Sequence, residues 1–544
     1  MESLFTAMMR RRSFIQYAVG LSGIGWLLAK CSANRKRVIP GAVIGASAAA
    51  GHLLRDNSIQ SEPVSTEYIG VAIIGGGISG LSAARWLHRS GRKDFVVFDL
   101  EKKYGGNAAS GRNEISAYPW GAHYVPLPNN NLEEYLSFLQ ECNVVAGYNE
   151  QGLPVYNEYY LCFEPEERLF INGSWQNGLV PHLGVPAKEN EEIRHFMQQM
   201  EVFRQQKGKD GKDAFAIPVN DSSQDEEWKQ LDSITMKEWL LQHNYTSSYL
   251  HWYANYCCRD DFGTRYDETS AWAGIHYFAG RKGIAANAKP NDVITWPQGN
   301  AWLAEQLCKD YQDKIQVSSV VLSVEHVNDK VAVKYYDLTG KQVKKLVADK
   351  CVICTPQFVT QRLLKQFPER QSLVQQHFSY SPWMVANITT DSLAERNGEP
   401  LSWDNVVYGS ESLGYVEATH QLLEQLVPVK VLTYYRPLTK ADPVTERKQA
   451  LQRTQAEWAE LILQELEPVH EDIREKVKHI DVMVWGHAMI QPGKNFVYNE
   501  ARHLLSQPVN NCIFFAHTDL AGISIFEEGF YQGIRAAQLL LQSV

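Results

Sequence analysis

Three glycines, spaced to turn the chain sharply beside a phosphate group, carry the clearest chemical signal in this sequence. Gly75, Gly77 and Gly80 follow the apolar run at 71–74 and precede a stretch of helical spacing. In a strand–turn–helix unit the first glycine permits the tight turn, and the second lets a pyrophosphate approach the backbone. The third lets the helix pack closely on the strand. The amides at the start of that helix, around Ser79, then favour the anion.

An acidic residue follows at the distance expected of a dinucleotide site. The next β-branched and aromatic run, 95–98, predicts a second strand that ends in Asp99, roughly 20 residues after Gly80. A carboxylate at this place can hydrogen-bond the ribose hydroxyls of an adenine dinucleotide. The glycines and the acid together predict a dinucleotide-binding α/β unit.

The composition is that of a folded globular protein. Of 544 residues, 44 % are hydrophobic and 21 % are charged, and the net charge is −9. This balance excludes a disordered chain, a polytopic membrane protein and a basic nucleic-acid binder, so we expect no nucleic acid among the partners. The nine cysteines are spread too thinly for a disulfide scaffold. Cys351 and Cys354 lie in a predicted strand, where neighbours alternate faces, so we expect packing there and no metal site.

Two further segments resemble parts of the superfamily of flavin-containing amine oxidases, protoporphyrinogen oxidases and phytoene desaturase-like enzymes. Gly105 and Gly106 resemble the glycine pair that closes over the pyrophosphate, with Asn107 in place of the usual basic residue. The bent strand at 315–324 resembles the family strand whose backbone meets the adenine, which the resemblance assigns to Val321. Both segments follow the glycine turn in the family's order.

The C-terminal stretch 512–542 resembles the family's closing motif. By this resemblance an acid, Asp519, binds the ribitol chain, and the N-terminus of a helix near Gly529 faces the flavin carbonyl. A helix N-terminus there stabilises the negative charge of a reduced flavin. The resemblance implies FAD as the cofactor and an FAD-dependent, amine oxidase-like oxidoreductase as the enzyme. A protein that binds NAD alone would need no matching segment so far downstream.

The order of the segments implies an α/β fold with two interleaved domains. A discontinuous, Rossmann-like FAD-binding domain of the GxGxxG type is expected from residues 66–130, 291–360 and 486–544. An α+β substrate-binding domain is expected from residues 131–290 and 361–485.

Three stretches of the substrate-binding domain have a local pattern of their own. Residues 189–206 predict a helix, and residues 447–466 predict one long amphipathic helix. The polar run at 256–263 is interpreted as a turn.

The stretch 118–126 is expected near the flavin ring, and His123 and Tyr124 are its candidate catalytic residues. In L-amino-acid oxidases an arginine at the position of Tyr124 clamps the substrate carboxylate, which a tyrosine cannot do. The strand that matches 382–388 also lacks the lysine common in amine oxidases. Both departures disfavour α-amino acids and leave neutral or cationic amines open. His123 acts as an acid or base, orients the flavin, or is structural.

Three aromatic residues are candidates for the wall of an apolar substrate pocket, with core packing as the alternative: Trp296, Trp485 and His487. The leading hypothesis is removal of a hydride from a C–N or C–C bond of a small or apolar molecule, with oxygen or a quinone as the acceptor. A desaturase-type or isomerase-type flavoenzyme is the alternative within the enzyme class. A flavin-binding partner of a membrane complex, without turnover, is the alternative outside it.

Residues 1–54 are interpreted as a targeting segment. Arg10 to Arg12 precede an apolar stretch and resemble a twin-arginine export signal, which predicts a periplasmic protein or one anchored in the membrane and facing the periplasm. Residues 46–48, Ala-Ser-Ala, form an acceptable cleavage site. The small residues Gly41, Gly45 and Ala49 suit a membrane hairpin. Cleavage, lipidation and retention as an anchor all stay open.

Overall fold

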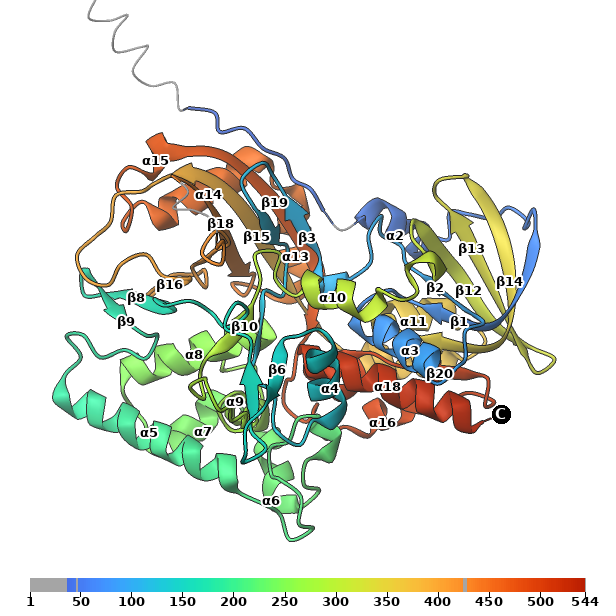
Figure 1. Ribbon diagram of the computed structural model, residues 1–544, viewed down its shortest axis with the longest axis horizontal. Helices are drawn as coiled ribbons and strands as arrows, with labels where there is room; N and C mark the ends of the chain where they lie inside the picture. The colour runs from blue at the N-terminus through green and yellow to red at the C-terminus, as the bar shows by residue number, and fades with distance from the viewer. Residues whose placement is uncertain (1–36, 46, 424–427, 544) are drawn as a thin grey trace, which may run out of the picture. The chain divides into compact units, whose positions relative to one another are not determined.

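The computed structural model describes residues 37–45, 47–423 and 428–543, and it divides the chain into two units at Pro40 and Gly41. The second unit contains two large β-sheets, each covered by helices (Figure 1). The first sheet gathers strands from both ends and the middle of the chain, whereas the second sheet uses only residues between 167 and 490. Segments distant in sequence therefore meet within the unit.

The first sheet is built around two neighbouring parallel strands, β1 and β14. The C-terminal half of β14 pairs in parallel with β20, and its N-terminal half pairs antiparallel with β13. Residues 71–74 are at most 2 % exposed because both faces of the sheet are covered. In sheet order the strands are β11 (Ile315–Gln316), β2 (Phe95–Phe98), β1 (Thr66–Ile74), β14 (Gln342–Ile353), β13 (Lys330–Asp337) and β12 (Ser319–Val327), with β20 (Ile513–Phe515) beside β14.

Two helices from opposite ends of the chain pack on each other against this sheet. They are α3 (Ile78–Arg89) and α18 (Phe526–Gln542). A Cβ atom on Gly533 of α18 would lie 2.2 Å from the carbonyl oxygen of Ser79, so only glycine permits the observed approach. Other helices around this sheet are α2 (Ala48–Arg55), α4 (Glu133–Glu141), α10 (Ala301–Cys308), α11 (Gln357–Leu363), α12 (Pro368–His377), α16 (Glu500–Ser506) and α17 (Thr518–Ala521).

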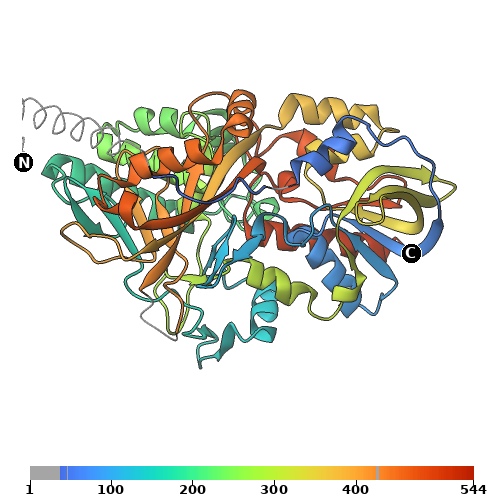
Figure 2. The same ribbon diagram turned by 90° about the horizontal axis from the view of Figure 1, so that it is seen from above.

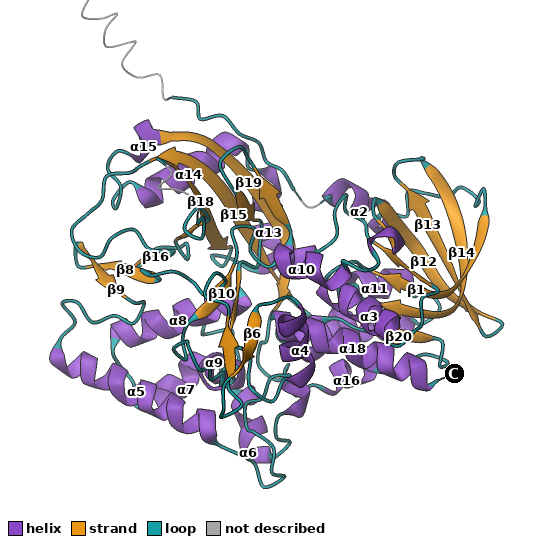
Figure 3. Ribbon diagram, viewed as in Figure 1, coloured by secondary structure: helices purple, strands orange, loops and turns teal. Residues whose placement is uncertain are grey.

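The second sheet has helices on both faces, as the purple and orange ribbons of Figure 3 show. One face packs on α5 (Ala187–Gln205), α7 (Met236–Gln242), α8 (Ser248–Phe262) and α9 (Ala271–Ala279). The other face packs on α13 (Pro443–Gln452) and α14 (Gln455–Leu466), near the short α15 (Ile473–Lys476). The strand order is β19 (Val477–Ile490), β15 (Tyr380–Asp391), β18 (Val429–Pro437), β17 (Tyr415–Glu417), β16 (Asp404–Val407), β8 (Glu167–Ile171) and β9 (Ser174–Asn177).

Short two-stranded sheets lie in the segments that connect the two large sheets. Figure 2 shows the two large sheets from above. Strand β5 (Tyr124–Pro126) pairs with β10 (Val293–Thr295), and its residues precede α4 in the chain. The remaining short elements are β3 (Ser110–Arg112), β4 (Ala117–Pro119), β6 (Val145–Tyr148), β7 (Pro154–Tyr156) and α6 (Glu226–Lys229).

The expected helix at 189–206 is confirmed by α5, but two other local expectations were wrong. The single helix expected at 447–466 is two helices, because Thr454 forms a capping box with Glu457 and starts α14 afresh. The stretch 256–263, expected to be a polar turn, is the last part of α8 and ends at Gly263 with a φ of 61°.

Strands of the first sheet fall in the three segments predicted to bind FAD, and those of the second sheet fall in the predicted substrate-binding segments except for the end of β19. The domain boundaries themselves stay predictions. Residues 1–36 of the predicted targeting segment lie outside the described residues. In contrast to its assignment to that segment, α2 packs on the first sheet. No helix of the described residues has the length and apolar character needed to cross a bilayer.

Candidate active site

The glycine turn after β1 leaves one face of the backbone uncovered. Gly75 has a φ of 106°, and a Cβ on Gly80 would lie 1.8 Å from the carbonyl oxygen of Gly75. A Cβ on Gly77, in contrast, would meet nothing nearer than the Cα of Gly106, 4.0 Å away. Gly105 donates its N–H to the carbonyl of Gly76 at 2.8 Å, which fixes this second glycine turn opposite the first. The two predicted phosphate turns therefore face each other across a narrow space.

Asp99 lies beside the first turn, where the sequence places it. Its carboxylate accepts the N–H of Gly76 at 2.9 Å and that of Glu101 at 2.8 Å. Burial raises the pKa of Asp99 to about 7, against the effect of these two hydrogen bonds. A carboxylate oxygen has lone pairs for more than one donor, so a sugar hydroxyl can be added to this arrangement.

Two helices present uncapped N-termini to the same region. No side chain caps α3 after Gly77, and none caps α18 after Ile525. Gly529 of α18 lies against Ile78 of α3, since a Cβ on Gly529 would be 3.3 Å from that side chain. Val321 precedes a break in the register of β12 with β13, which gives the bend expected of its strand. The predicted dinucleotide residues of both halves of the chain are thus brought together.

Asp519 is engaged by protein groups. It is 1 % exposed, and its Oδ2 accepts the N–H of Gln357 at 2.7 Å and the hydroxyl of Tyr380 at 2.6 Å. Its Oδ1 lies 3.0 Å from Nδ1 of His517. Although burial acts to raise it, the charge of His517 and the donated hydrogen bonds leave the pKa of Asp519 lowered. In this structure Asp519 connects the start of α11 to the start of β15, and its contact with ribitol stays a prediction.

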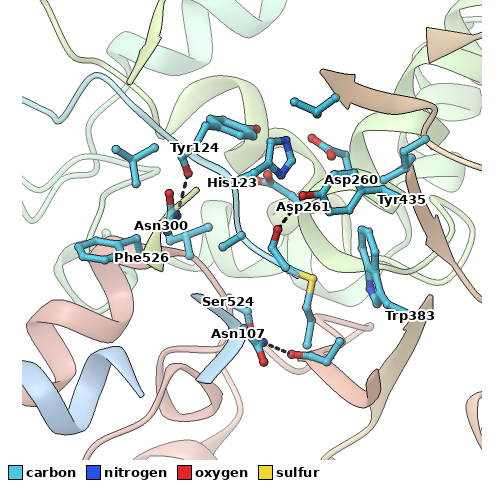
Figure 4. A pocket seen from close by; sticks show the side chains of 18 of the residues that line it. Asn107, His123, Tyr124, Asp260, Asp261, Asn300, Trp383, Tyr435, Ser524 and Phe526 are labelled. Carbon is cyan, nitrogen blue, oxygen red and sulfur yellow. Dashed lines mark hydrogen bonds between the residues drawn. The ribbon is translucent and has the colours of Figure 1, made fainter. Parts of the chain in front are cut away.

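A cavity opens beside Asn107 and is lined by strands of the second sheet, the end of α8 and the start of α18 (Figure 4). The volume of the cavity is about 180 Å³. Besides Asn107, three predicted residues line it: His123, Tyr124 and Trp485. The ring of His123 stacks on Tyr435 with centroids 4.6 Å apart, and Trp485 donates to the carbonyl of Trp120 at 2.6 Å.

The other two expected wall residues do not line this cavity. Trp296 is buried in the core, where it stacks on Trp302 with centroids 4.7 Å apart. Its expected role as a wall is corrected to core packing, the alternative named for it. His487 stacks on Phe358 with centroids 4.2 Å apart, outside the set of lining residues. The position of each ring depends on the aromatic side chain that it packs against in the folded chain, and a local sequence pattern does not indicate that partner.

Carboxyl groups that the sequence analysis did not select line the cavity as well. Asp260 and Asp261 come from the last turn of α8, Asp404 from the start of β16, and Glu527 from the first turn of α18. Arg281 donates to both oxygens of Asp261, at 2.7 and 2.9 Å. Neither Asp260 nor Asp404 forms a salt bridge within the part of the chain that the structure describes. Among the described lining residues, Arg281 is the only arginine or lysine.

Burial dominates the titration of these groups. It raises the pKa of Asp260 to about 7, with repulsion from Asp261 adding to the rise. It raises the pKa of Asp404 well above its ordinary value, helped by repulsion from Glu167 and Asp260. It also raises the pKa of Glu527 to about 7. Such pKa values are typical of buried carboxyl groups at functional sites that have no bound cation beside them.

Comparison with known proteins identifies the fold. A family model described as flavin containing amine oxidoreductase matches residues 78–541. The chain belongs to this family. Like the rest of the flavin-containing amine oxidoreductases, it is an FAD-dependent oxidoreductase. No curated protein matches the sequence.

Solved structures share this fold at low sequence identity. A double mutant of putrescine oxidase aligns with a TM-score of 0.65 at 15 % identity over 88 % of this chain and 100 % of that chain. Cyclohexylamine oxidase from Brevibacterium oxydans IH-35A aligns with a TM-score of 0.61 at 15 % identity over 87 % and 99 %. A fatty acid isomerase from P. acnes aligns with a TM-score of 0.60 at 14 % identity over 87 % and 98 %. Two activities on one fold mean that the cavity residues must decide the substrate.

FAD fits the residues described above. The uncovered backbone at Gly77 and Gly106 leaves room for a pyrophosphate, since a Cβ at Gly77 meets no atom closer than 4.0 Å. The uncapped N-termini of α3 and α18 supply N–H groups and positive dipole ends for negative charge. Asn107, which follows the second glycine turn, reaches the carbonyl of Ala488, and both residues line the cavity. Asn107 therefore joins the second glycine turn to the cavity.

Proposed function

We propose that this enzyme oxidises an amine that carries a second positive charge, such as an aliphatic diamine, at the carbon bonded to nitrogen. The observation that carries the proposal is the pair of cavity carboxyls, Asp260 and Asp404, which have no salt bridge in the described chain. Arg281 is already bound to Asp261. A cationic substrate therefore supplies the charge that the cavity lacks.

The position of the carboxyls supports two separate charges on the substrate. In Figure 4, Asn107 and Ser524 lie on one side of the cavity, and Asp260 and Asp261 lie across it. Asn107 follows the glycine turn assigned to the cofactor, so the reacting amine must reach that side. The carboxyls on the opposite side are then placed to bind the far end of the same molecule.

The other lining side chains suit a cation and its methylene chain. Tyr124, Tyr256 and Tyr435 line the cavity, and an ammonium group is attracted to the faces of such rings. Trp383 adds apolar surface for methylene groups. Burial lowers the pKa of His123 to about 4, so its imidazole is neutral at neutral pH and does not repel the cation.

Proton movement accompanies binding in this scheme. Asp260 and Glu527 have pKa values raised to about 7, so each holds a proton for much of the time in the empty cavity. An ammonium group nearby favours the charged carboxylate and lowers that pKa. The carboxyl then releases its proton and binds the ammonium by a charge-assisted hydrogen bond.

The cofactor is assigned to the Rossmann-like unit that the sequence predicts. Gly75, Gly77 and Gly80 with Asp99 would hold the ADP part of FAD, and the N-terminus of α18 would face its ring. Bound FAD supplies a two-electron acceptor for the substrate hydride, and oxygen or a quinone re-oxidises it.

The second candidate is oxidation or isomerisation of a C–C bond in an apolar molecule. The aromatic and aliphatic walls, among them Trp383, Val385 and Trp485, favour this alternative. A fatty acid, however, would bring a carboxylate next to Asp260 and Asp404, with Arg281 already engaged. Such a carboxylate finds no free arginine or lysine among the described lining residues and can bind only while these carboxyls stay protonated, so the diamine is the better match.

The decisive experiment compares a diamine with a monoamine of the same carbon-chain length and includes a fatty acid as a third candidate substrate. Purified holoenzyme is mixed anaerobically with 1,4-diaminobutane, 1-aminobutane or a fatty acid, and bleaching of the flavin band is followed. We expect the diamine to be oxidised with a kcat/KM about 10- to 100-fold above the monoamine, the worth of one charge-assisted hydrogen bond. Asp404→Asn should remove most of this preference and leave the monoamine rate unchanged.

Equal rates with both amines would refute the second charge while leaving amine oxidation intact. Bleaching by the fatty acid alone would favour the C–C chemistry. A flavin that no donor reduces would point to the partner protein without turnover. The three outcomes separate the substrate class from the reaction class.

The cellular location is a further part of the proposal. Arg10 to Arg12 and the apolar stretch after them support export by the twin-arginine route, which carries folded proteins and therefore permits FAD to be loaded first. Exported protein in the periplasm of a host with this route, and its absence after Arg11 and Arg12 are replaced by lysine, would bear this out.

A further inference from the structure

A segment that precedes β1 bridges the two sheets. Ala42 accepts the N–H of Val482 at 2.9 Å, and Ile44 donates to the carbonyl of Val482 at 2.7 Å. The segment thus adds a short parallel bridge to β19 of the second sheet, and Figure 1 shows it running from there toward α2. A Cβ on Gly41 would lie 1.7 Å from the carbonyl oxygen of Ile480, so this docking requires glycine.

The same segment is bound to the loop that follows the predicted ribose acid. Ser47 donates its N–H to one oxygen of Glu101 and its hydroxyl to the other, both at 2.8 Å. Glu101 in turn donates its N–H to Asp99 at 2.8 Å. A two-point contact with a carboxylate is stronger than a single neutral hydrogen bond. Ser47 is therefore linked through Glu101 to Asp99, the carboxylate assigned to the ribose.

Helix α2 then covers the strand assigned to the adenine. Leu53 and Leu54 of α2 pack with Val320 and Leu322, the two neighbours of Val321 on β12. Neighbours on a strand face opposite Val321, so α2 lies on the other side of this strand from the Val321 side chain while holding the strand in place. No residue of α2 is fully buried, which is typical of a helix laid on a surface.

On the side of the second sheet, the segment contacts β19 itself, at Val482. The same strand continues to Ala488, which lines the cavity next to Asn107. The segment therefore contacts Glu101, which bonds to the predicted ribose acid, and the strand that leads to the cavity.

We propose that residues 41–45 and 47–58, here called the strap, close the outer side of the FAD groove and are retained in the mature protein. The Ala-Ser-Ala sequence at 46–48 is then no processing site, because a cut there would remove the docking at Val482 and the two hydrogen bonds to Glu101.

A strap across the groove controls the rate of cofactor exchange in both directions. Loosening it speeds the release of FAD and also speeds the binding of FAD to the apoprotein, because both require the strap to move aside. A purely structural contact behaves differently: its loss leaves the binding rate unchanged or lowers it. The two rates measured together therefore distinguish closure from general stability.

The experiment uses Ser47→Ala and Gly41→Val in the full chain, with Ser58→Ala as the matched control. Ser58 is an exposed serine of the same segment whose N–H bonds to Leu53. Release of FAD from the holoenzyme is followed by the rise in FAD fluorescence, and binding by its decrease on mixing FAD with apoprotein. We expect both rates to rise about tenfold in Ser47→Ala, since one charge-assisted hydrogen bond is lost.

Gly41→Val should give the same pair of changes by undocking the strap from β19. If neither variant speeds both rates relative to Ser58→Ala, the strap does not close the groove. The mass of the mature protein tests retention independently: an N-terminus at or before Gly41 is expected. An N-terminus at Ser47 or beyond would overturn retention.

Discussion

Asp260→Asn tests whether burial in the cavity disfavours the ionised form of the Asp260 carboxyl group. Burial raises the pKa of Asp260 from 3.8 to about 7. One pKa unit corresponds to about 1.4 kcal/mol, so full ionisation costs the folded protein at most about 4 kcal/mol. Asp260 keeps part of its surface open to the cavity, and water there weakens the effect. We therefore expect asparagine, which has the same shape and no charge, to recover about 1–2 kcal/mol.

The gain must depend on pH in one direction. The folded protein binds the proton of Asp260 more tightly than the unfolded chain does, so this residue lowers stability as the pH rises from about 4 through 7. Asparagine does not titrate, and at pH 5 both side chains are neutral in the folded state. The variant should therefore unfold at a temperature about 1–4 °C above wild type at pH 9, with a clearly smaller gain at pH 5, where the unfolded chain already ionises this residue but the folded protein does not.

The assay is thermal unfolding of FAD-loaded enzyme without substrate at both pH values, with Asp313→Asn as the control at an exposed aspartate. The same preparations give the kinetic counterpart: KM for 1,4-diaminobutane should rise about 10- to 100-fold in Asp260→Asn. A gain of equal size at pH 5 and pH 9, or a loss at pH 9, would refute a carboxylate that is disfavoured by burial.

Three other substitutions test the remaining assignments. Gly77→Val should give folded, colourless protein, because its side chain fills the space beside Gly106, whereas Gly147→Val, also with open space, should stay yellow. His123→Ala should slow anaerobic flavin reduction at unchanged FAD content by removing the stack on Tyr435, and unchanged kinetics would make His123 structural. Glu527→Gln should raise the unfolding temperature more at pH 9 than at pH 5, since burial raises the pKa of Glu527 to about 7.

Residues whose role depends on the backbone beside them were predictable from the sequence. The turn at Gly75 to Gly80 needs only a strand, three glycines and a helix, and the structure has β1 and α3 on either side of it. The split of the helix at 447–466 could have been predicted too. Thr454 and Glu457 have the spacing of a capping box, which indicates a new helix start within the longer amphipathic pattern.

The cavity carboxyls were not predictable in the same way. Asp260 and Asp404 are 144 positions apart in the numbering of the chain and meet because α8 covers the sheet that contains β16. The acidic pair at 260–261 was visible, but a helix end that enters a cavity and a polar turn at the surface have the same composition. Only the salt bridge distinguishes a structural acid from a binding one: Asp261 has one with Arg281, and Asp260 has none within the described residues.

The raised pKa values and the choice of substrate are two consequences of the same burial. An empty cavity with Asp260, Asp404 and Glu527 all ionised would be strongly disfavoured, so these carboxyls hold protons until a cation enters. A dication allows two of these carboxyls to ionise, and each then binds one positive charge. A neutral or anionic molecule leaves the carboxyls protonated and gains no charge-assisted hydrogen bond from them. The fold that amine oxidases share with a fatty acid isomerase does not make this distinction; in the proposed function the carboxyl groups of this cavity make it. Binding of the substrate should accordingly release protons near neutral pH, and a calorimetric titration in two buffers of different ionisation enthalpy would measure how many.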